Sequence, residues 1–176
     1  MIIVADTEAD NLVPQAKRIH CLCLHIIDTG EDFSFADHPG YTPIRDGLEV
    51  LQEADFIVGH NFRQYDSKLI RKLTGVELPQ EKILDTLEMC RKLVDLIEME
   101  KLDYELHAAG LMPLDCVKRM SLKAWGYRLG RLKGTFGETT DWQTFSTAMV
   151  DYCVDDVLLN RDLYLMFERM IMLDGH

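Results

Sequence analysis

The sequence predicts an α/β domain whose sheet is partly antiparallel. Short apolar runs typical of strands alternate with segments whose apolar residues recur at helical spacing. The turn signal Asp28-Thr29-Gly30 separates two of the strands, and so short a connection joins antiparallel neighbours. At 176 residues and 47% hydrophobic content, residues 1–176 fit one domain with a full core.

The first strand organises the rest of the chain. Apolar, mostly β-branched residues occupy 2–5 and lead directly into Asp6-Thr7-Glu8, a pattern typical of a strand buried on both faces. Alternate residues of a strand project to the same side, so Asp6 and Glu8 should point together. A Mg²⁺ ion would compensate two such carboxylates, although solvated acids at an ordinary strand end would give the same pattern.

The remaining elements alternate between strand and helix. Further strands are predicted over 17–27, 33–36, 56–59 and 83–84. Helices are predicted over 44–54, over the segment that Gly75 closes, from Asp85-Thr86 to about Glu98, near 120–128, and from a cap at Thr140-Asp141 toward Met170.

Residues 103–140 are the least regular part and carry an uneven charge. Between Cys116 and Gly137 the chain has no acid and six basic residues, Lys118, Arg119, Lys123, Arg128, Arg131 and Lys133. In a chain of formal net charge −11, such a patch favours contact with a phosphate backbone, and Trp125 offers an aromatic face to a base. The alternative is a solvated helix face with Trp125 in the core.

Composition excludes several classes. No apolar run approaches the ~20 residues of a membrane span, and the N-terminus has no signal-peptide pattern. Five cysteines without a C-x-x-C pair indicate reduced thiols of a cytoplasmic protein and argue against a zinc site. Cys21 and Cys23 would share one strand face, where core packing is expected. The acidic net charge argues against non-specific coating of nucleic acid, but not against an enzyme with a local basic face.

The last predicted helix carries a second chemical pair. Tyr152 and Asp156 are four residues apart, hence on one helix face and one turn apart. A buried acid beside a phenol can hold a metal ion and orient a water molecule, whereas on an exposed face the two would be an ordinary surface pair.

Three segments together resemble the motifs of a known family. Asp6-Thr7-Glu8, Asn61-Phe-Arg-Gln-Tyr65-Asp66 and Tyr152-Cys-Val-Asp-Asp156 resemble, in order and separation, the three motifs of the DEDDy branch of DnaQ-like 3′→5′ exonucleases. Two further segments, 83–87 and 122–130, resemble the proofreading domain of phage family A DNA polymerases. The resemblance covers residue 1 to about 165. In that family polymerase domains would follow, so an excised domain, a split subunit and a free-standing exonuclease all stay open.

The resemblance implies a ribonuclease H-like fold, a mixed five-stranded sheet flanked by helices. It also implies hydrolysis of the terminal phosphodiester by two divalent metal ions, Mg²⁺ or Mn²⁺. By similarity Asp6 bridges the ions, Glu8 and Asp156 complete the first site, and Asp66 holds the second through water. Tyr152 would orient the attacking water through its hydroxyl.

Substrate contacts follow partly from the resemblance and partly from the basic patch. Asn61 is similar to a family residue that hydrogen-bonds the terminal nucleotide, and Leu12 to one that wedges against its base. Asn61 could instead close the loop after the fourth strand, and Leu12 could be core. The residues expected at the substrate are Thr7, Leu12, Asn61, Arg128, Arg131 and Lys133.

The leading expectation is therefore a metal-dependent 3′→5′ exodeoxyribonuclease that releases nucleoside monophosphates from single-stranded or frayed 3′ DNA ends, in proofreading or DNA processing. The alternatives are an exoribonuclease or oligonucleotidase of the same fold, and a proofreading subunit that docks on a separate DNA polymerase. No membrane partner is expected, and the expected location is the cytoplasm, that of the host if the chain is phage-encoded.

Overall fold

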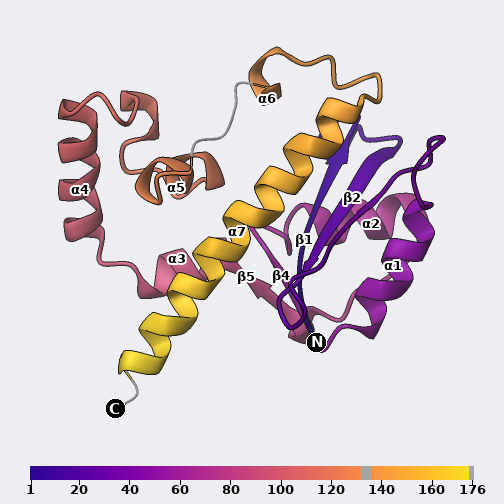
Figure 1. The fold of residues 1–176 in the computed structure, drawn as a ribbon, viewed down its shortest axis with the longest axis horizontal. Helices are drawn as coiled ribbons and strands as arrows, with labels where there is room; N and C mark the ends of the chain where they lie inside the picture. The colour runs from indigo at the N-terminus through magenta and orange to yellow at the C-terminus, as the bar shows by residue number, and fades with distance from the viewer. Residues whose placement is uncertain (132–135, 175–176) are drawn as a thin grey trace.

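A mixed five-stranded sheet forms the centre of the molecule (Figure 1). The computed structural model describes residues 1–131 and 136–174. The strand order is β3-β2-β1-β4-β5, with bounds β1 Ile2–Ala9, β2 Ile19–Ile26, β3 Asp32–Phe35, β4 Phe56–Gly59 and β5 Ile83–Asp85. β2 is antiparallel to β1 and β3, whereas β1, β4 and β5 are parallel. The predicted mixed α/β sheet is confirmed, with β1 at its centre.

Helices cover both faces of this sheet (Figure 1). The helices are α1 Ile44–Glu53, α2 Asp66–Thr74, α3 Thr86–Leu93, α4 Leu96–Ala108, α5 Leu122–Arg128, α6 Phe136–Thr139 and α7 Thr147–Asp174, with short 3₁₀ turns η1 Gln80–Lys82 and η2 Leu114–Cys116. Ile3 and Ala5 of β1 pack with α1 and α2 on one face. Val4 packs against α7 on the other. α5 lies beyond α7, where Trp125 contacts the Phe167 ring edge-on at 5.8 Å.

The alternation along β1 decides where its acids point. Val4 is fully buried beneath α7, and Asp6 and Glu8 share its side of the strand. Thr7, on the opposite side, is 3% exposed. The last three residues of β1 thus send two carboxylates toward α7 and one hydroxyl toward the face that α2 covers.

One predicted helix is in fact two. The helix expected to reach about Glu98 ends at Leu93, because Val94 is extended. Asp95 then begins α4, and its carboxylate accepts hydrogen bonds from the backbone N–H groups of Ile97 (2.9 Å) and Glu98 (3.3 Å). This is the N-cap geometry that aspartate favours, and it makes part of the supposedly irregular 103–140 segment helical.

The C-terminal helix starts later than predicted. Asp141 caps only a turn, in which its carboxylate accepts from the Gln143 N–H at 3.0 Å. The helix itself begins at Thr147, and Ser146 Oγ accepts from the Met149 N–H at 3.3 Å. A residue that can cap a helix can equally close a turn, which is why the pattern misled. Among the residues that the structure describes, no helix has both the length and the apolar character to cross a bilayer.

Candidate active site

Asp6 and Glu8 converge near the end of β1. Ligand atoms of Asp6, Glu8 and Cys153 all lie within 4.8 Å of one another. Cys153, on α7, places its Sγ 3.3 Å from the Asp6 carbonyl oxygen and 3.5 Å from the carboxylate Oδ2. The two acids therefore point together as their spacing predicted, and they do so against the last helix.

Helix α7 brings the second chemical pair to the same place. Cys153 lies between Tyr152 and Asp156 along the helix, so its contact with Asp6 fixes this turn against β1. Val150 and Val157 pack on Val4 from the turns before and after. Asp156 is only 7% exposed, so it is not part of a surface pair.

Asp66 is the first residue of α2 and is tied to β1 by Thr7. Its Oδ1 accepts hydrogen bonds from Thr7 Oγ1 at 2.5 Å and from the Thr7 N–H at 3.1 Å. Burial raises the pKa of the Asp66 carboxyl to about 7, and the two Thr7 bonds oppose that rise. Both donors of buried Thr7 are engaged in this way, so Thr7 positions Asp66, and the direct substrate contact expected of Thr7 stays a prediction.

This donor set fits a hard divalent cation. Carboxylate oxygens are the ligands that Mg²⁺ and Mn²⁺ prefer, and two of them meet at the end of β1. Asp66 is held by Thr7 on the opposite side of β1 from Asp6 and Glu8. Asp156 lies about one helical turn after Cys153, which contacts Asp6. The residues Asp6, Glu8, Asp66 and Asp156 could hold such ions.

A cavity of about 410 Å³ opens beside Glu8. Its lining residues are Glu8, Ala9, Asp10, Asn11, Leu12, Tyr65, Trp142 and Gln143. Leu12 is 66% exposed at this cavity, so the alternative that it belongs to the core is wrong. The Tyr65 hydroxyl donates to the Asn11 carbonyl at 3.3 Å. Burial and the nearby Asp66 and Glu8 raise the pKa of Tyr65 to about 12, so this phenol stays protonated at neutral pH.

Trp142 is a site residue that the sequence prediction missed. Its ring lies edge-on to Tyr152 at 6.2 Å, and Phe136 of α6 lies 5.5 Å from the same tyrosine. A Cβ atom on Gly137 would stand 3.0 Å from the Tyr152 hydroxyl, so α6 covers that hydroxyl closely. The sequence predicts a helix from residue 140, which would contain Trp142; because α7 begins only at Thr147, Trp142 lies in the preceding connection and lines the cavity.

Asn61 does close the loop after β4. Its backbone is in the left-handed region (φ 61°), which asparagine tolerates better than most residues. Its N–H donates to Asp85 Oδ1 at 3.0 Å, and Asp85 Oδ2 accepts from the Arg63 N–H at 3.1 Å. The part-buried Asn61 side chain is not used by these backbone bonds, and its contact with a nucleotide stays a prediction.

Arg128 is not a phosphate contact. Its side chain is 2% exposed, and Nε and Nη2 each donate to a carboxylate oxygen of the fully buried Asp103 at 2.7 Å. The guanidinium also lies 4.7 Å from the Trp125 ring centre. Trp125 itself is 5% exposed, which confirms the core alternative for that residue.

Acids from elsewhere in the chain also reach much of the remaining basic patch. Lys118 pairs with Glu100 at 2.5 Å, Lys123 with Asp115 at 4.0 Å, and Arg131 with Asp162 at 3.2 Å. Arg131 keeps a side chain that is 42% exposed. Lys133, also expected at the substrate, lies outside the described residues.

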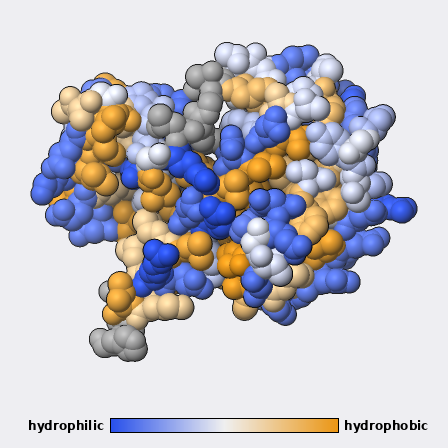
Figure 2. Space-filling model, in the orientation of Figure 1, coloured by the Kyte–Doolittle hydropathy of each residue, from blue (hydrophilic) through white to orange (hydrophobic). Residues whose placement is uncertain are grey.

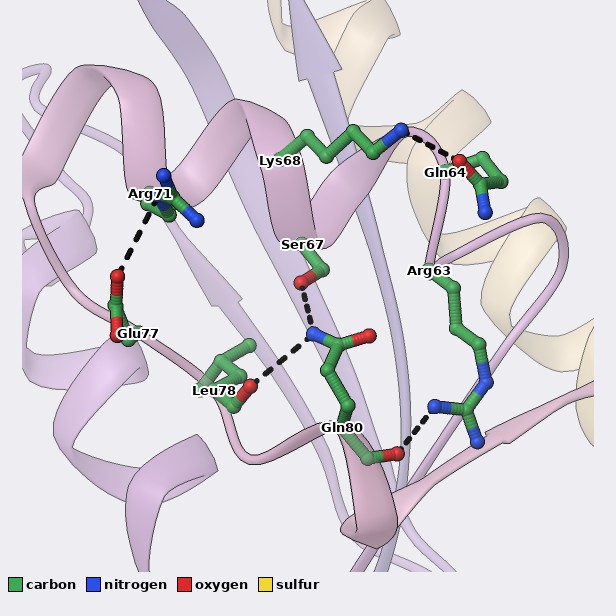
Figure 3. Close-up of a pocket in the computed structure, with 8 residues that line it drawn as sticks. All are labelled: Arg63, Gln64, Ser67, Lys68, Arg71, Glu77, Leu78 and Gln80. Carbon is green, nitrogen blue, oxygen red and sulfur yellow. Dashed lines mark hydrogen bonds and ion pairs between the residues drawn. The ribbon is translucent and has the colours of Figure 1, made fainter.

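A second cavity of about 320 Å³ lies along α2 and is basic (Figure 3). Its lining residues are Arg63, Gln64, Ser67, Lys68, Arg71, Glu77, Leu78 and Gln80. The Lys68 ammonium donates to Gln64 Oε1 at 2.5 Å, and Arg71 pairs with Glu77 at 3.5 Å. Because α2 begins at Asp66, this positive charge lies within two turns of a candidate metal ligand.

The fold is that of ribonuclease H-like exonuclease domains. The EXO domain of Aedes aegypti Nibbler superposes with a TM-score of 0.67 at 10% identity, covering 97% of this chain and 79% of that one. Brucella melitensis NrnC with bound Mg²⁺ gives a TM-score of 0.62 at 19% identity, covering 99% and 75%. A structure of NrnC bound to pGG is similar to the same degree, with a TM-score of 0.62 at 18% identity, covering 99% and 74%.

Sequence comparison points to phage DNA polymerases. The chain is 30% identical over 185 residues to the DNA-directed DNA polymerase of Enterobacteria phage T3, which covers 92% of this chain and 26% of the polymerase. The polymerase of Escherichia phage T7 is 30% identical over 189 residues with the same coverage. The chain thus spans about a quarter of the length of these relatives. No family model matches. The similarity to phage polymerases that the motifs predicted is confirmed.

Proposed function

We propose that the chain is a metal-dependent 3′→5′ exonuclease that releases nucleoside monophosphates from single-stranded or frayed 3′ DNA ends. One observation supports this above others: α2 and α7 both contact the last residues of β1. Asp6 and Glu8 converge there, Thr7 holds Asp66, and Cys153 fixes the Tyr152–Asp156 turn against Asp6. The 30% identity to phage polymerases supports DNA as the substrate.

Asp6, Glu8, Asp66 and Asp156 would hold two divalent ions, Mg²⁺ or Mn²⁺. When bound, such a pair supplies positive charge to both the attacking and the leaving oxygen of an in-line displacement. The Tyr152 hydroxyl orients the attacking water, in a setting that Phe136 and Trp142 keep apolar on two sides. Because an ordinary tyrosine titrates near ~10, Tyr152 acts by orientation rather than as a base.

The terminal nucleotide would enter the cavity beside Glu8. Its volume of about 410 Å³ is in the range of small-ligand pockets. Exposed Leu12 and the ring of Trp142 line it and offer apolar surfaces to a base of any identity. Asn61 would hydrogen-bond the nucleotide, and Arg131, Lys133 and the α2 residues Lys68 and Arg71 would attract phosphates.

A very short oligonucleotide is the second candidate substrate. Brucella melitensis NrnC, which shares the fold, is bound to pGG in one structure. A ribonucleotide would be distinguished from a deoxyribonucleotide by hydrogen bonds to its 2′-hydroxyl, for which Asn11 and Gln143 at the cavity offer polar groups.

Docking on a separate polymerase is the third candidate, and the surface of α4 favours it. α4 and the segment that follows it as far as η2 carry several exposed apolar side chains, Leu96, Ile97, Leu102, Tyr104, Leu111 and Leu114. Hydrophobic surface is also visible at the left of Figure 2, where Figure 1 places α4. An exposed apolar surface of this kind commonly marks a protein contact. The similarity of this chain to phage DNA polymerases supports a polymerase as that partner.

The test is digestion of oligonucleotides labelled at the 5′ end. Single-stranded DNA, blunt duplex DNA and RNA of one sequence are incubated with Mg²⁺ or Mn²⁺, with and without chelator. We expect a ladder that shortens from the 3′ end of single-stranded DNA and disappears with chelator. Faster digestion of RNA would favour the second candidate. Cleavage that survives chelation, or no cleavage of any substrate, would overturn the proposal.

A further inference from the structure

Three buried thiols meet directly beneath the carboxylates. Cys21 and Cys23 project from β2, and Cys153 from α7. Their sulfur atoms all lie within 4.8 Å of one another, and the three residues are 0%, 1% and 0% exposed. The sequence argued against a zinc site because Cys21 and Cys23 form no C-x-x-C pair, but it did not show that the fold adds a third thiol from a distant helix.

The spacing of the sulfurs suits one soft metal ion. A Zn–S bond is about 2.3 Å, so three sulfurs around one tetrahedral ion stand roughly 3.8 Å apart. Sulfurs spaced no wider than 4.8 Å need to move inward by only about half an ångström each to reach that geometry. Thiolates select soft or borderline ions such as Zn²⁺ over Mg²⁺, which prefers oxygen.

The same cysteine belongs to both clusters. Cys153 is within 4.8 Å of Asp6 and Glu8 on one side and of Cys21 and Cys23 on the other. Asp6 Oδ2 is 3.5 Å from the Cys153 sulfur, so this carboxylate is at hand as a fourth ligand once it turns toward the other two sulfurs. An ion held by the three sulfurs would therefore turn Asp6 away from the neighbouring oxygen site. Asp6 is also partly exposed, so an ion can enter past it.

We propose that Cys21, Cys23 and Cys153 form a second, soft-metal site for Zn²⁺, with Asp6 as the fourth ligand, and that its occupation blocks the carboxylate centre. Each thiol that binds loses its proton to solvent, so metal binding releases up to three protons. The binding part stands on the thiol geometry alone. The inhibitory part rests on the proposed nuclease function.

Binding is tested first, without any activity assay. Cd²⁺, a soft ion with strong ultraviolet thiolate-to-metal charge-transfer absorption, is titrated into the whole chain in excess Mg²⁺ and a phosphine reductant that does not chelate. We expect one equivalent to bind. Cys23→Ser should lower the apparent affinity about tenfold or more. The matched control is Cys90→Ser, which alters a free thiol that is equally buried elsewhere.

The outcomes separate clearly. Because a serine in the core can disturb folding, Cys23→Ala is made as well, and both variants are checked by circular dichroism. Absence of the charge-transfer band, or a band that Cys23→Ser and Cys23→Ala leave at full strength, overturns the site. Loss of the band in both folded variants, with its retention in Cys90→Ser, supports it.

Inhibition is tested second. With Mg²⁺ in excess, low Zn²⁺ should abolish DNA hydrolysis by the unaltered chain, whereas Cys23→Ser should remain active and resist Zn²⁺. Equal inhibition of both proteins would place Zn²⁺ at the carboxylates alone and overturn the coupling. A chain that binds Cd²⁺ but hydrolyses no nucleic acid would refute the proposed function and leave the soft-metal site standing.

Discussion

Single side chains in this site are held by neighbours that the chemistry does not use. The backbone N–H and the hydroxyl of Thr7 both donate hydrogen bonds to Asp66, and Cys153 contacts both the backbone and the carboxylate of Asp6. Arg128, which sequence alone would send to a phosphate, is instead buried with Asp103. The positions of the acids therefore depend on packing contacts as much as on the motifs themselves.

Removing two acids tests the site most directly. Asp6→Ala with Glu8→Ala should reduce turnover in Mg²⁺ to below a few per cent, because the two converging ligands are lost. The melting temperature without metal should hold or rise, since two like charges no longer repel. Circular dichroism and the labelled-DNA assay check both points. A double mutant that keeps more turnover than this would show that the site lies elsewhere.

Tyr152→Phe keeps the ring and removes only the hydroxyl. Groups that orient or transfer a proton contribute ~10²–10⁴-fold, and we expect the low end because bound metal would supply most of the activation. Single-turnover rates at saturating DNA give the effect, and DNA affinity in Ca²⁺ should not change. An unaltered rate would reassign Tyr152 to packing against Phe136 and Trp142.

Asp103→Ala would leave the Arg128 guanidinium buried without its carboxylate. Breaking a buried ion pair from one side costs about 3–5 kcal/mol, so the free energy of unfolding, measured by urea titration, should fall by that amount. The control is Asp115→Ala, which removes the exposed partner of Lys123 and should cost about 0–1 kcal/mol. Equal losses in both variants would contradict the assignment of Arg128 to the interior.

At the scale of elements, the junction between α6 and α7 shapes the site. α7 begins at Thr147, so residues 140–146 form a connection that returns α6 over Tyr152. The His20 ring anchors this connection through a 2.8 Å hydrogen bond to the Trp142 carbonyl oxygen, and the Gln143 amide donates to the Asp10 carbonyl at 2.8 Å. The cover over Tyr152 is thereby fixed to β2 and to the end of β1.

Gly137→Ala tests that cover. The added Cβ would lie 3.0 Å from the Tyr152 hydroxyl, so the phenol must shift and turnover should fall. In a Tyr152→Phe background the oxygen is gone, and the same substitution should have much less effect. The double-mutant cycle of turnover rates should therefore show strong non-additivity. Additive losses would mean that Gly137 acts through the α6 backbone instead.

At the scale of the whole molecule, charge is redistributed by folding. All the charged residues of the segment 116–137 are basic, yet in the fold Glu100 and Asp103 of α4 and Asp162 of α7 pair with three of them. The cavity along α2 holds Lys68, whose ammonium bonds to the neutral Gln64 (Figure 3). The chain as a whole has a net charge of −11 and would repel a phosphate backbone. Basic surfaces close to the candidate metal ligands, such as the cavity along α2, would therefore have to attract the nucleic acid.

Salt dependence of DNA binding will tell which surface does so. Arg131→Gln and Lys68→Gln are compared in the Asp6→Ala, Glu8→Ala background with Ca²⁺, so that digestion cannot imitate weak binding. Each lost phosphate contact should reduce the slope of log affinity against log salt by roughly 0.7 for a single strand. Affinity should fall similarly for all sequences.

The control for that comparison is Arg45→Gln. Arg45 lies on α1 with a side chain that is 82% exposed, and its loss should leave the slope unchanged. Lys72 would be a poor control, because its ammonium donates to the Val13, Pro14 and Ala16 carbonyls and supports the loop after β1. If Arg131→Gln and Lys68→Gln both show the same salt slope as Arg45→Gln, neither residue contacts a phosphate. The DNA strand would then be held mainly by the metal ions and Asn61.

Local patterns in the sequence predicted the strands of the sheet, because each strand is recognised from a short run of residues. They also predicted that Asp6 and Glu8 converge, because alternate residues of one strand point to the same side. The turn at Asp28 correctly indicated the antiparallel pairing of β2 with β3. The fate of Arg128 could not be predicted, since its partner Asp103 is 25 residues away on another helix. Trp142 and the third thiol were hidden for the same reason: each acts through a contact that only tertiary packing creates.

The contact between Cys153 and Asp6 joins residues 147 positions apart. A contact between residues so far apart forms only after the intervening chain has been brought together, so we expect α7 to dock on β1 late in folding. A chain whose sheet has formed but whose last helix is still free lacks Tyr152 and Asp156 at the site. The proposed hydrolysis is thereby confined to fully folded molecules, and an incomplete copy emerging from the ribosome is harmless to the nucleic acids around it.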